Sequence, residues 1–188
     1  MLKNYKTMTC VAALAALLLA GPALLAQNPT ATGVINGTLF NKDGIAILFI
    51  TDPGGVALGA SGTSAASANL GTVSAFGPLS AGVTRPAISA TTFTVRTIFD
   101  VQVVQGGLTS TTYTLSAQLA AAAPTGFTYA IDAITLTTAA QTVQTNATYN
   151  TNVAHNLNLT ISRAAPGAGG PAVGTPVTAT INFTATAN

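Results

Sequence analysis

Few residues in this chain can do acid–base or nucleophilic chemistry. His155 is the single histidine, and the carboxylates are four aspartates without any glutamate, namely Asp43, Asp52, Asp100 and Asp132. A serine nucleophile could use His155 with Asp100 or Asp132, but the chain has no Gly-x-Ser-x-Gly turn to present the serine. Glycoside hydrolysis needs two convergent carboxyl groups of unequal pKa, and no pair of aspartates stands out. The sequence therefore predicts no catalytic residue and a protein that is not an enzyme.

The surroundings of these residues favour structural roles. His155 is in phase with Val153 and Leu157, which predicts an imidazole on the core side of a strand, held by a hydrogen bond. Asp100 and Arg96 share an outward strand face four residues apart, a separation of about 13 Å that prevents direct pairing. We expect both to serve solubility or to block pairing at a sheet edge.

No cofactor or metal site is predicted either. Residues 41–44 (Asn-Lys-Asp-Gly) resemble part of a calcium loop, but the distal bidentate glutamate is missing, so a turn is the better interpretation. Phosphate-binding glycine loops, zinc patterns and dinucleotide fingerprints are absent from the sequence.

The first residues predict export. Lys3 and Lys6 form a positive start, residues 11–20 are apolar, and Ala26 is a small residue suited to signal-peptidase cleavage. A transmembrane anchor is the alternative, but the apolar run is shorter than the roughly 20 residues a span needs. We therefore expect a signal peptide at 1–26 and an extracellular, cell-surface or periplasmic domain at 27–188, with no membrane insertion after cleavage.

Charge and cysteine content limit the partners of the mature chain. Lys3 and Lys6 are two of the six cations, so cleavage leaves four cations against four anions and a net charge of zero. Binding to nucleic acid or to anionic membranes through charge is therefore not expected. Cys10, the only cysteine, leaves with the signal, which excludes disulfides and thiolate metal sites.

Alternation with a period of two dominates the mature sequence and predicts strands with one buried face. It is clearest in residues 93–104, 112–119, 153–161 and 177–185. The predicted core includes Phe93, Val95, Phe99, Val101, Leu115, Leu157, Leu159, Ile181 and Phe183.

Three regions are less regular. Residues 34–40 and the apolar run 45–50 are expected to form a hairpin, with Gly44 at positive φ in its turn. In residues 127–136 the phase switches, which a β-bulge near Asp132 would explain. Residues 53–91 are rich in Gly, Ala and Ser, and contain either short strands (56–58, 70–76, 86–90) or a loop.

Strands separated by turns, without crossover helices, predict an all-β fold: one antiparallel immunoglobulin-like β-sandwich after the signal peptide. An outer-membrane β-barrel is the alternative. It would need apolar outward faces and aromatic girdles, for which the chain has few aromatic residues.

The alternating segments 113–119 and 153–161 and the closing Ile181-Asn182-Phe183-Thr184-Ala185 resemble uncharacterised bacterial secreted proteins, and more loosely pilin and spore-coat-type surface domains. The resemblance covers about residues 90–188, implies an extracytoplasmic immunoglobulin-like fold, and carries no functional residues. The usual pilin disulfide is missing.

These observations favour a non-enzymatic, exported structural or adhesive surface protein that associates with itself or with another surface protein. The uncharged segment 177–185 is a candidate edge for such association, unless it is paired on both sides within the monomer. The alternative function is a small extracytoplasmic module that binds glycans or proteins through loops at one end of the sandwich.

N-terminal sequencing of exported protein should begin at Gln27, because Ala26 is the small residue that precedes the expected scissile bond. A soluble product that retains Met1 in the cytoplasm would contradict the export hypothesis.

Overall fold

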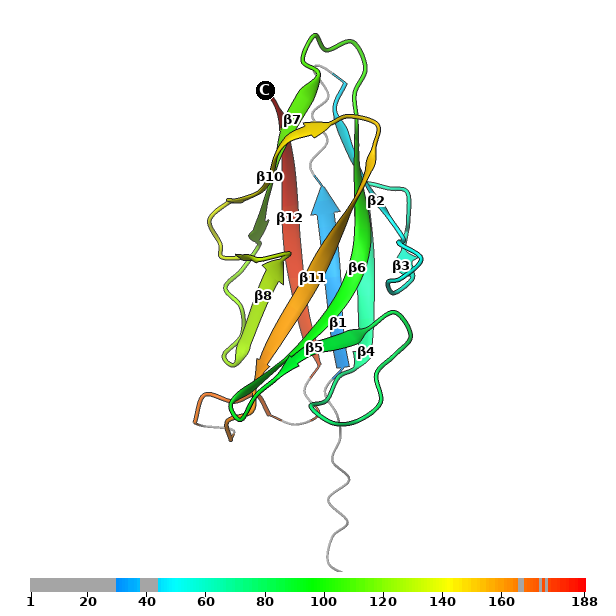
Figure 1. Ribbon diagram of the computed structural model, residues 1–188. Coiled ribbons are helices and arrows are strands. Elements are labelled where there is room, and N and C mark those ends of the chain that lie inside the picture. Colours follow the sequence, from blue (N-terminus) through cyan, green and yellow to red (C-terminus); the bar gives the residue numbers. More distant parts are fainter. Residues whose placement is uncertain (1–29, 38–43, 166–167, 173, 175) are drawn as a thin grey trace, which may run out of the picture.

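The computed structural model describes residues 30–37, 44–165, 168–172, 174 and 176–188 (Figure 1). The predicted signal peptide and Asp43 lie outside these ranges. The strands are β1 Thr30–Gly37, β2 Ala46–Ile50, β3 Leu58–Gly59, β4 Ala65–Thr72, β5 Thr84–Ile88, β6 Thr92–Val104, β7 Thr112–Leu119, β8 Phe127–Ile131, β9 Ile134–Thr135, β10 Gln141–Thr148, β11 Asn152–Ser162 and β12 Val177–Ala187. In the described part of the chain, no helix is long and apolar enough to cross a membrane.

Two sheets face each other in an elongated sandwich, with loops at both ends (Figure 1). The first sheet has the order β10-β7-β12-β1-β4-β3, and the second has the order β2-β6-β11-β8-β9 with β5 also paired to β6. Each sheet keeps open edges rather than closing on itself. The predicted all-β sandwich is therefore confirmed.

The pairing is not entirely antiparallel. β1 lies parallel to β12, with Ala31 opposite Val177 and Gly37 opposite Phe183. The predicted hairpin between 34–40 and 45–50 is wrong, because β1 and β2 belong to different sheets. Their inward faces meet across the core instead, where a Cβ on Gly37 would lie 3.0 Å from the Ile47 Cβ. Gly44 does have the expected positive φ, of 69°.

β12 is an interior strand of the first sheet. It is bonded to β1 on one side and to β7 on the other. Of the two placements considered for segment 177–185, the structure has the one paired within the monomer, because both of its polar edges are used.

The core is built from the alternation that the sequence shows. β6 alternates between half-buried and buried positions along all thirteen residues, and β7 does so along eight. Every residue of the predicted core is buried; the largest fully buried side chains are Tyr113, Phe49, Phe99, Phe183, Ile35, Ile47, Leu115, Ile131, Leu157, Leu159, Ile161 and Ile181.

Three features differ from what the sequence pattern alone indicates. The phase switch near Asp132 is a two-residue turn between β8 and β9, with Ile131 paired to Ile134 and Asp132 at φ 53°, rather than a bulge. β10 was not predicted, because its two register shifts break the period of two. Asn158 lies on the outward face of β11 but is only 7% exposed, since Arg96 and the backbone at Asp132 cover it.

Region 53–91 contains strands rather than a single loop: β3 with two residues, β4 with eight and β5 with five. The buried side chain of Thr97 anchors this region to β6. The Thr97 hydroxyl accepts a hydrogen bond from Val56 N at 2.9 Å and donates one to the Gly82 carbonyl at 3.0 Å. Gly55 lets the chain approach this closely, because a Cβ there would lie 1.8 Å from the Ile98 carbonyl oxygen. The Gly-, Ala- and Ser-rich region 53–91 is thus anchored to β6, the longest strand of the described structure.

Replacing Leu159 with Ala should lower the free energy of unfolding by about 2–5 kcal/mol, because a fully buried side chain leaves a cavity. Asn158→Ala should cost about 1–3 kcal/mol, since it leaves buried hydrogen-bonding groups unpaired. The exposed Asn152→Ala on the same strand is the control and should change stability by less than about 0.5 kcal/mol. Chemical denaturation measures all three, and equal effects at positions 159 and 152 would contradict the assigned faces.

Candidate functional site

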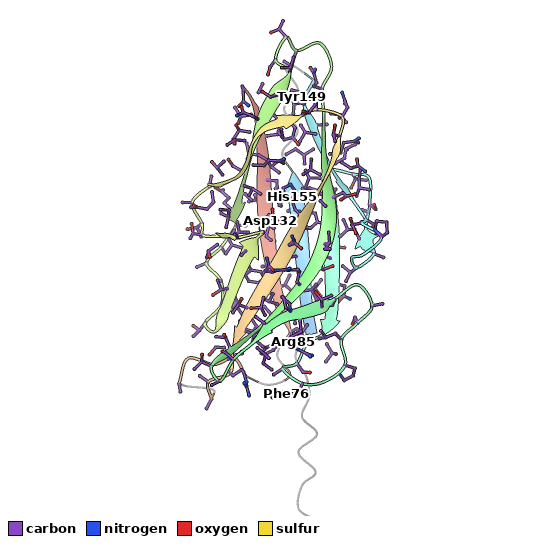
Figure 2. The ribbon with its side chains drawn as sticks, in the orientation of Figure 1. Phe76, Arg85, Asp132, Tyr149 and His155 are labelled. Carbon is purple, nitrogen blue, oxygen red and sulfur yellow. The ribbon has the colours of Figure 1, made fainter. Side chains whose placement is uncertain are left out.

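His155 and Asp132 are brought together in the middle of the sandwich (Figure 2). His155 lies on β11 with its side chain 4% exposed, and its Nδ1 is 2.8 Å from Asp132 Oδ2. Asp132 occupies the turn after β8, where its left-handed backbone places the carboxylate beside β11. The core-side orientation predicted for His155 is confirmed, and Asp132 is its hydrogen-bonding partner.

Histidine and aspartate are two members of a catalytic triad, and in the described part of the chain no serine hydroxyl is hydrogen-bonded to His155. Among the described residues, His155 Nε2 is buried without a hydrogen-bond partner. Its ring lies against Phe99, with centroids 6.2 Å apart. The other Asp132 oxygen accepts hydrogen bonds from the Asn156 backbone N–H at 2.8 Å and from its amide at 3.1 Å. These contacts give hydrogen-bond partners to the edge of β11 just beyond the end of β8, which is a structural role.

Opposing effects act on the pKa of Asp132. Burial raises it, but the hydrogen bonds from His155 and Asn156 and the nearby His155 ring outweigh burial, so that the pKa lies below its usual value of 3.8. The folded protein therefore holds this proton less tightly than the unfolded chain does. Asp132 contributes stability above pH 3.8, and that contribution is lost as the pH falls through the folded-state pKa.

Asp100 behaves in the opposite way. Burial, the negative charge of Asp52 and a side-chain contact with Asp52 raise its pKa, and the charge interaction with His155 offsets this only in part. Asp100 and Arg96 both lie on the interior strand β6, so of the two roles expected for them, solubility or the blocking of a sheet edge, the second does not apply. Two carboxylates alone do not form a metal centre, and no group of three candidate ligands occurs in the described residues.

Lowering the pH from about 5 to about 2 should therefore destabilise the protein in part through Asp132. Asp132→Asn should reduce stability at neutral pH by about 1 kcal/mol or more and flatten this pH dependence, since the charge-assisted bonds are lost. Asp100→Asn, which removes the repulsion with Asp52, should raise stability at neutral pH. Denaturation at several pH values tests both, and a slope unchanged in Asp132→Asn would contradict this role.

A different group of residues faces solvent at one end of the sandwich (Figure 2). Phe76 is 77% exposed and Ile88 is 46% exposed, and these are the two exposed large hydrophobic residues of the described chain. Two arginines adjoin them, Arg85 on β5 and Arg163 just after β11. We call Phe76, Arg85, Ile88 and Arg163 the Phe76 patch.

The turn that carries Phe76 is held by hydrogen bonds. Ser74 Oγ accepts from Gly77 N at 2.7 Å, which closes the turn around Phe76. Arg85 donates from Nε to the Ser74 carbonyl at 3.0 Å and from Nη2 to the Gly77 carbonyl at 2.7 Å. An exposed aromatic ring on a braced turn loses little conformational entropy when it binds a partner.

Arg163 connects the turn to the rest of the patch. Its guanidinium lies 5.0 Å from the centroid of the Phe76 ring, within the range of a cation–π contact. It also donates to the Ser89 carbonyl, next to Ile88, and its backbone N–H bonds the Thr91 carbonyl at 2.7 Å. One side of the ring is thus in contact with a cation, while most of the ring remains accessible.

The sequence prediction missed this patch. Phe76 falls in a region of Gly, Ala and Ser without a clear period, and the arginines come from positions far along the chain. The available signal was a lone large aromatic residue within a turn-rich segment, and loops at one end of the sandwich were expected to bind only under the alternative function.

Comparison with known proteins adds no family: no family model matches the chain, and no curated protein matches it.

Proposed function

We propose that this chain is an exported, non-enzymatic surface protein that acts by adhesion, and that the Phe76 patch is its contact surface. The observation that carries the proposal is the 77% exposure of Phe76 on a turn held by Ser74 and Arg85. The ring offers apolar contact area, and the guanidinium groups of Arg85 and Arg163 offer hydrogen-bond donors. Aromatic residues and arginine are the residue types enriched in recognition surfaces.

The strand edges give less support to self-association. β3 and β9 have two residues each, and β10 is interrupted by two register shifts. The outer edge of β2 is occupied, because Phe49 N donates to the Thr63 carbonyl at 2.9 Å and the Phe49 carbonyl accepts from Gly62 N at 2.6 Å. Short, irregular or covered edges are the devices that limit edge-to-edge pairing. Adhesion through loops is therefore the better-supported form of the structural or adhesive role.

The alternative is a small extracytoplasmic module that binds a soluble glycan or protein. It would use the same patch, because the patch is where the described chain exposes large apolar side chains. The two functions differ in where the ligand resides, on a surface or in solution, and share one binding site.

Labelled, secreted protein should adhere to the surface of the cells that produce it, and Phe76→Ala should reduce the bound amount severalfold, because the exposed ring is removed. Thr109→Ala, an exposed substitution between β6 and β7 at the opposite end, is the matched control and should bind like the wild type. Equal adhesion by the two variants would contradict the proposal. Size-exclusion chromatography and electron microscopy of the same samples distinguish a monomeric adhesive protein from a polymer.

A further inference from the structure

The Phe76 patch combines an aromatic ring with cations that have no nearby counter-charge among the described residues. Among the described residues no salt bridge joins an arginine to an aspartate: Asp132 pairs with His155, and Asp52 and Asp100 lie beside each other. Arg85 and Arg163 form hydrogen bonds only to backbone carbonyls in the described structure. A ligand that fits this end must therefore carry negative charge and a face that stacks on an aromatic ring.

The guanidinium groups are fixed in position. Arg85 uses Nε and Nη2 for Ser74 and Gly77, and Arg163 uses Nη1 for Ser89. Each guanidinium has five N–H donors, so both retain donors for a ligand. A planar guanidinium held in a fixed position suits a carboxylate that is itself attached to a rigid ring. The headgroups of a fluid lipid surface need no such fixed geometry.

The remaining surface around the patch also indicates a carbohydrate rather than a membrane. The neighbouring turn supplies hydroxyl groups: the Ser89 hydroxyl lies 3.4 Å from that of Thr91 and 3.2 Å from that of Thr92. Only Phe76 and Ile88 expose substantial apolar area, which is little for insertion into a bilayer. The mature chain, with four charges of each sign, has no excess positive charge to hold it at an anionic membrane.

We infer that the Phe76 patch binds a carboxylate-bearing polysaccharide of the uronate class. This inference rests on the proposed adhesive function and names its ligand. The exposed face of Phe76 stacks on the C–H face of a sugar ring, and Arg163 or Arg85 pairs with the ring carboxylate. Neutral polysaccharides lack the group that these arginines recognise.

The test compares polygalacturonate with its methyl ester, which keeps the sugar ring and removes the charge, by calorimetry on the purified secreted protein. We expect binding to polygalacturonate that weakens with salt and is lost with the ester.

Phe76→Ala and Arg163→Gln should each raise the Kd about tenfold, because each removes one of the two contacts. Phe76→Tyr should retain binding. Thr109→Asp, which lowers the net charge by the same one unit at the other end, should bind like the wild type. Because Phe76 is exposed, an unchanged melting temperature in Phe76→Ala confirms that its fold is intact.

Equal binding to both polymers would overturn the assignment of a carboxylate ligand. Binding to phosphatidylglycerol vesicles without binding to polygalacturonate would replace it with a lipid surface. Unchanged affinity in folded Phe76→Ala would overturn the site. If the protein adheres to cells through Phe76 but ignores polygalacturonate, the ligand class fails while the proposed adhesive function stands; if Phe76→Ala adheres normally, the adhesive surface itself is wrong.

Discussion

The structure depends on β6 and on the strict alternation of its side chains. This one strand pairs with β11 along eleven residues, with β2 at its C-terminal part and with β5 at its N-terminal part. Its inward residues supply Phe93, Val95, Phe99, Val101 and Val103 to the core. A shift of one residue would turn all of these side chains to solvent, so the burial of one face fixes the register of three neighbours together.

The long strands could be predicted because their signal is local. Residues 93–104, 112–119 and 177–185 alternate without interruption, and the structure places β6, β7 and β12 there. The way in which strands are connected is not a local property, because nothing in residues 34–50 distinguishes a hairpin from a connection that crosses between the two sheets. β4 was only partly predicted, because its inward residues are chiefly Ala66, Ala68 and Leu70, and alanine marks a strand weakly.

The Phe76 patch was less predictable for a related reason. The Phe76 patch joins a turn after β4, the strand β5 and the start of the loop after β11. Its bracing bonds run from arginine side chains to backbone carbonyls, and carbonyl acceptors exist at every residue. The contact between His155 and Asp132 likewise depends on a left-handed aspartate in a two-residue turn. Residue type alone identifies His155 as a candidate, whereas its partner, Asp132, is identified only by the fold.

The parallel pairing of β1 with β12 has a mechanical consequence. The chain enters β1 at the end of the sandwich opposite to the end where it leaves β12 (Figure 1). A pull between the segments that enter β1 and leave β12 therefore acts along both strands in shear. In this geometry the rungs from Ala31–Val177 to Gly37–Phe183 share the load, instead of opening one after another like a zipper. A domain pulled between these two segments would resist extension best in this direction, and single-molecule stretching would measure that resistance.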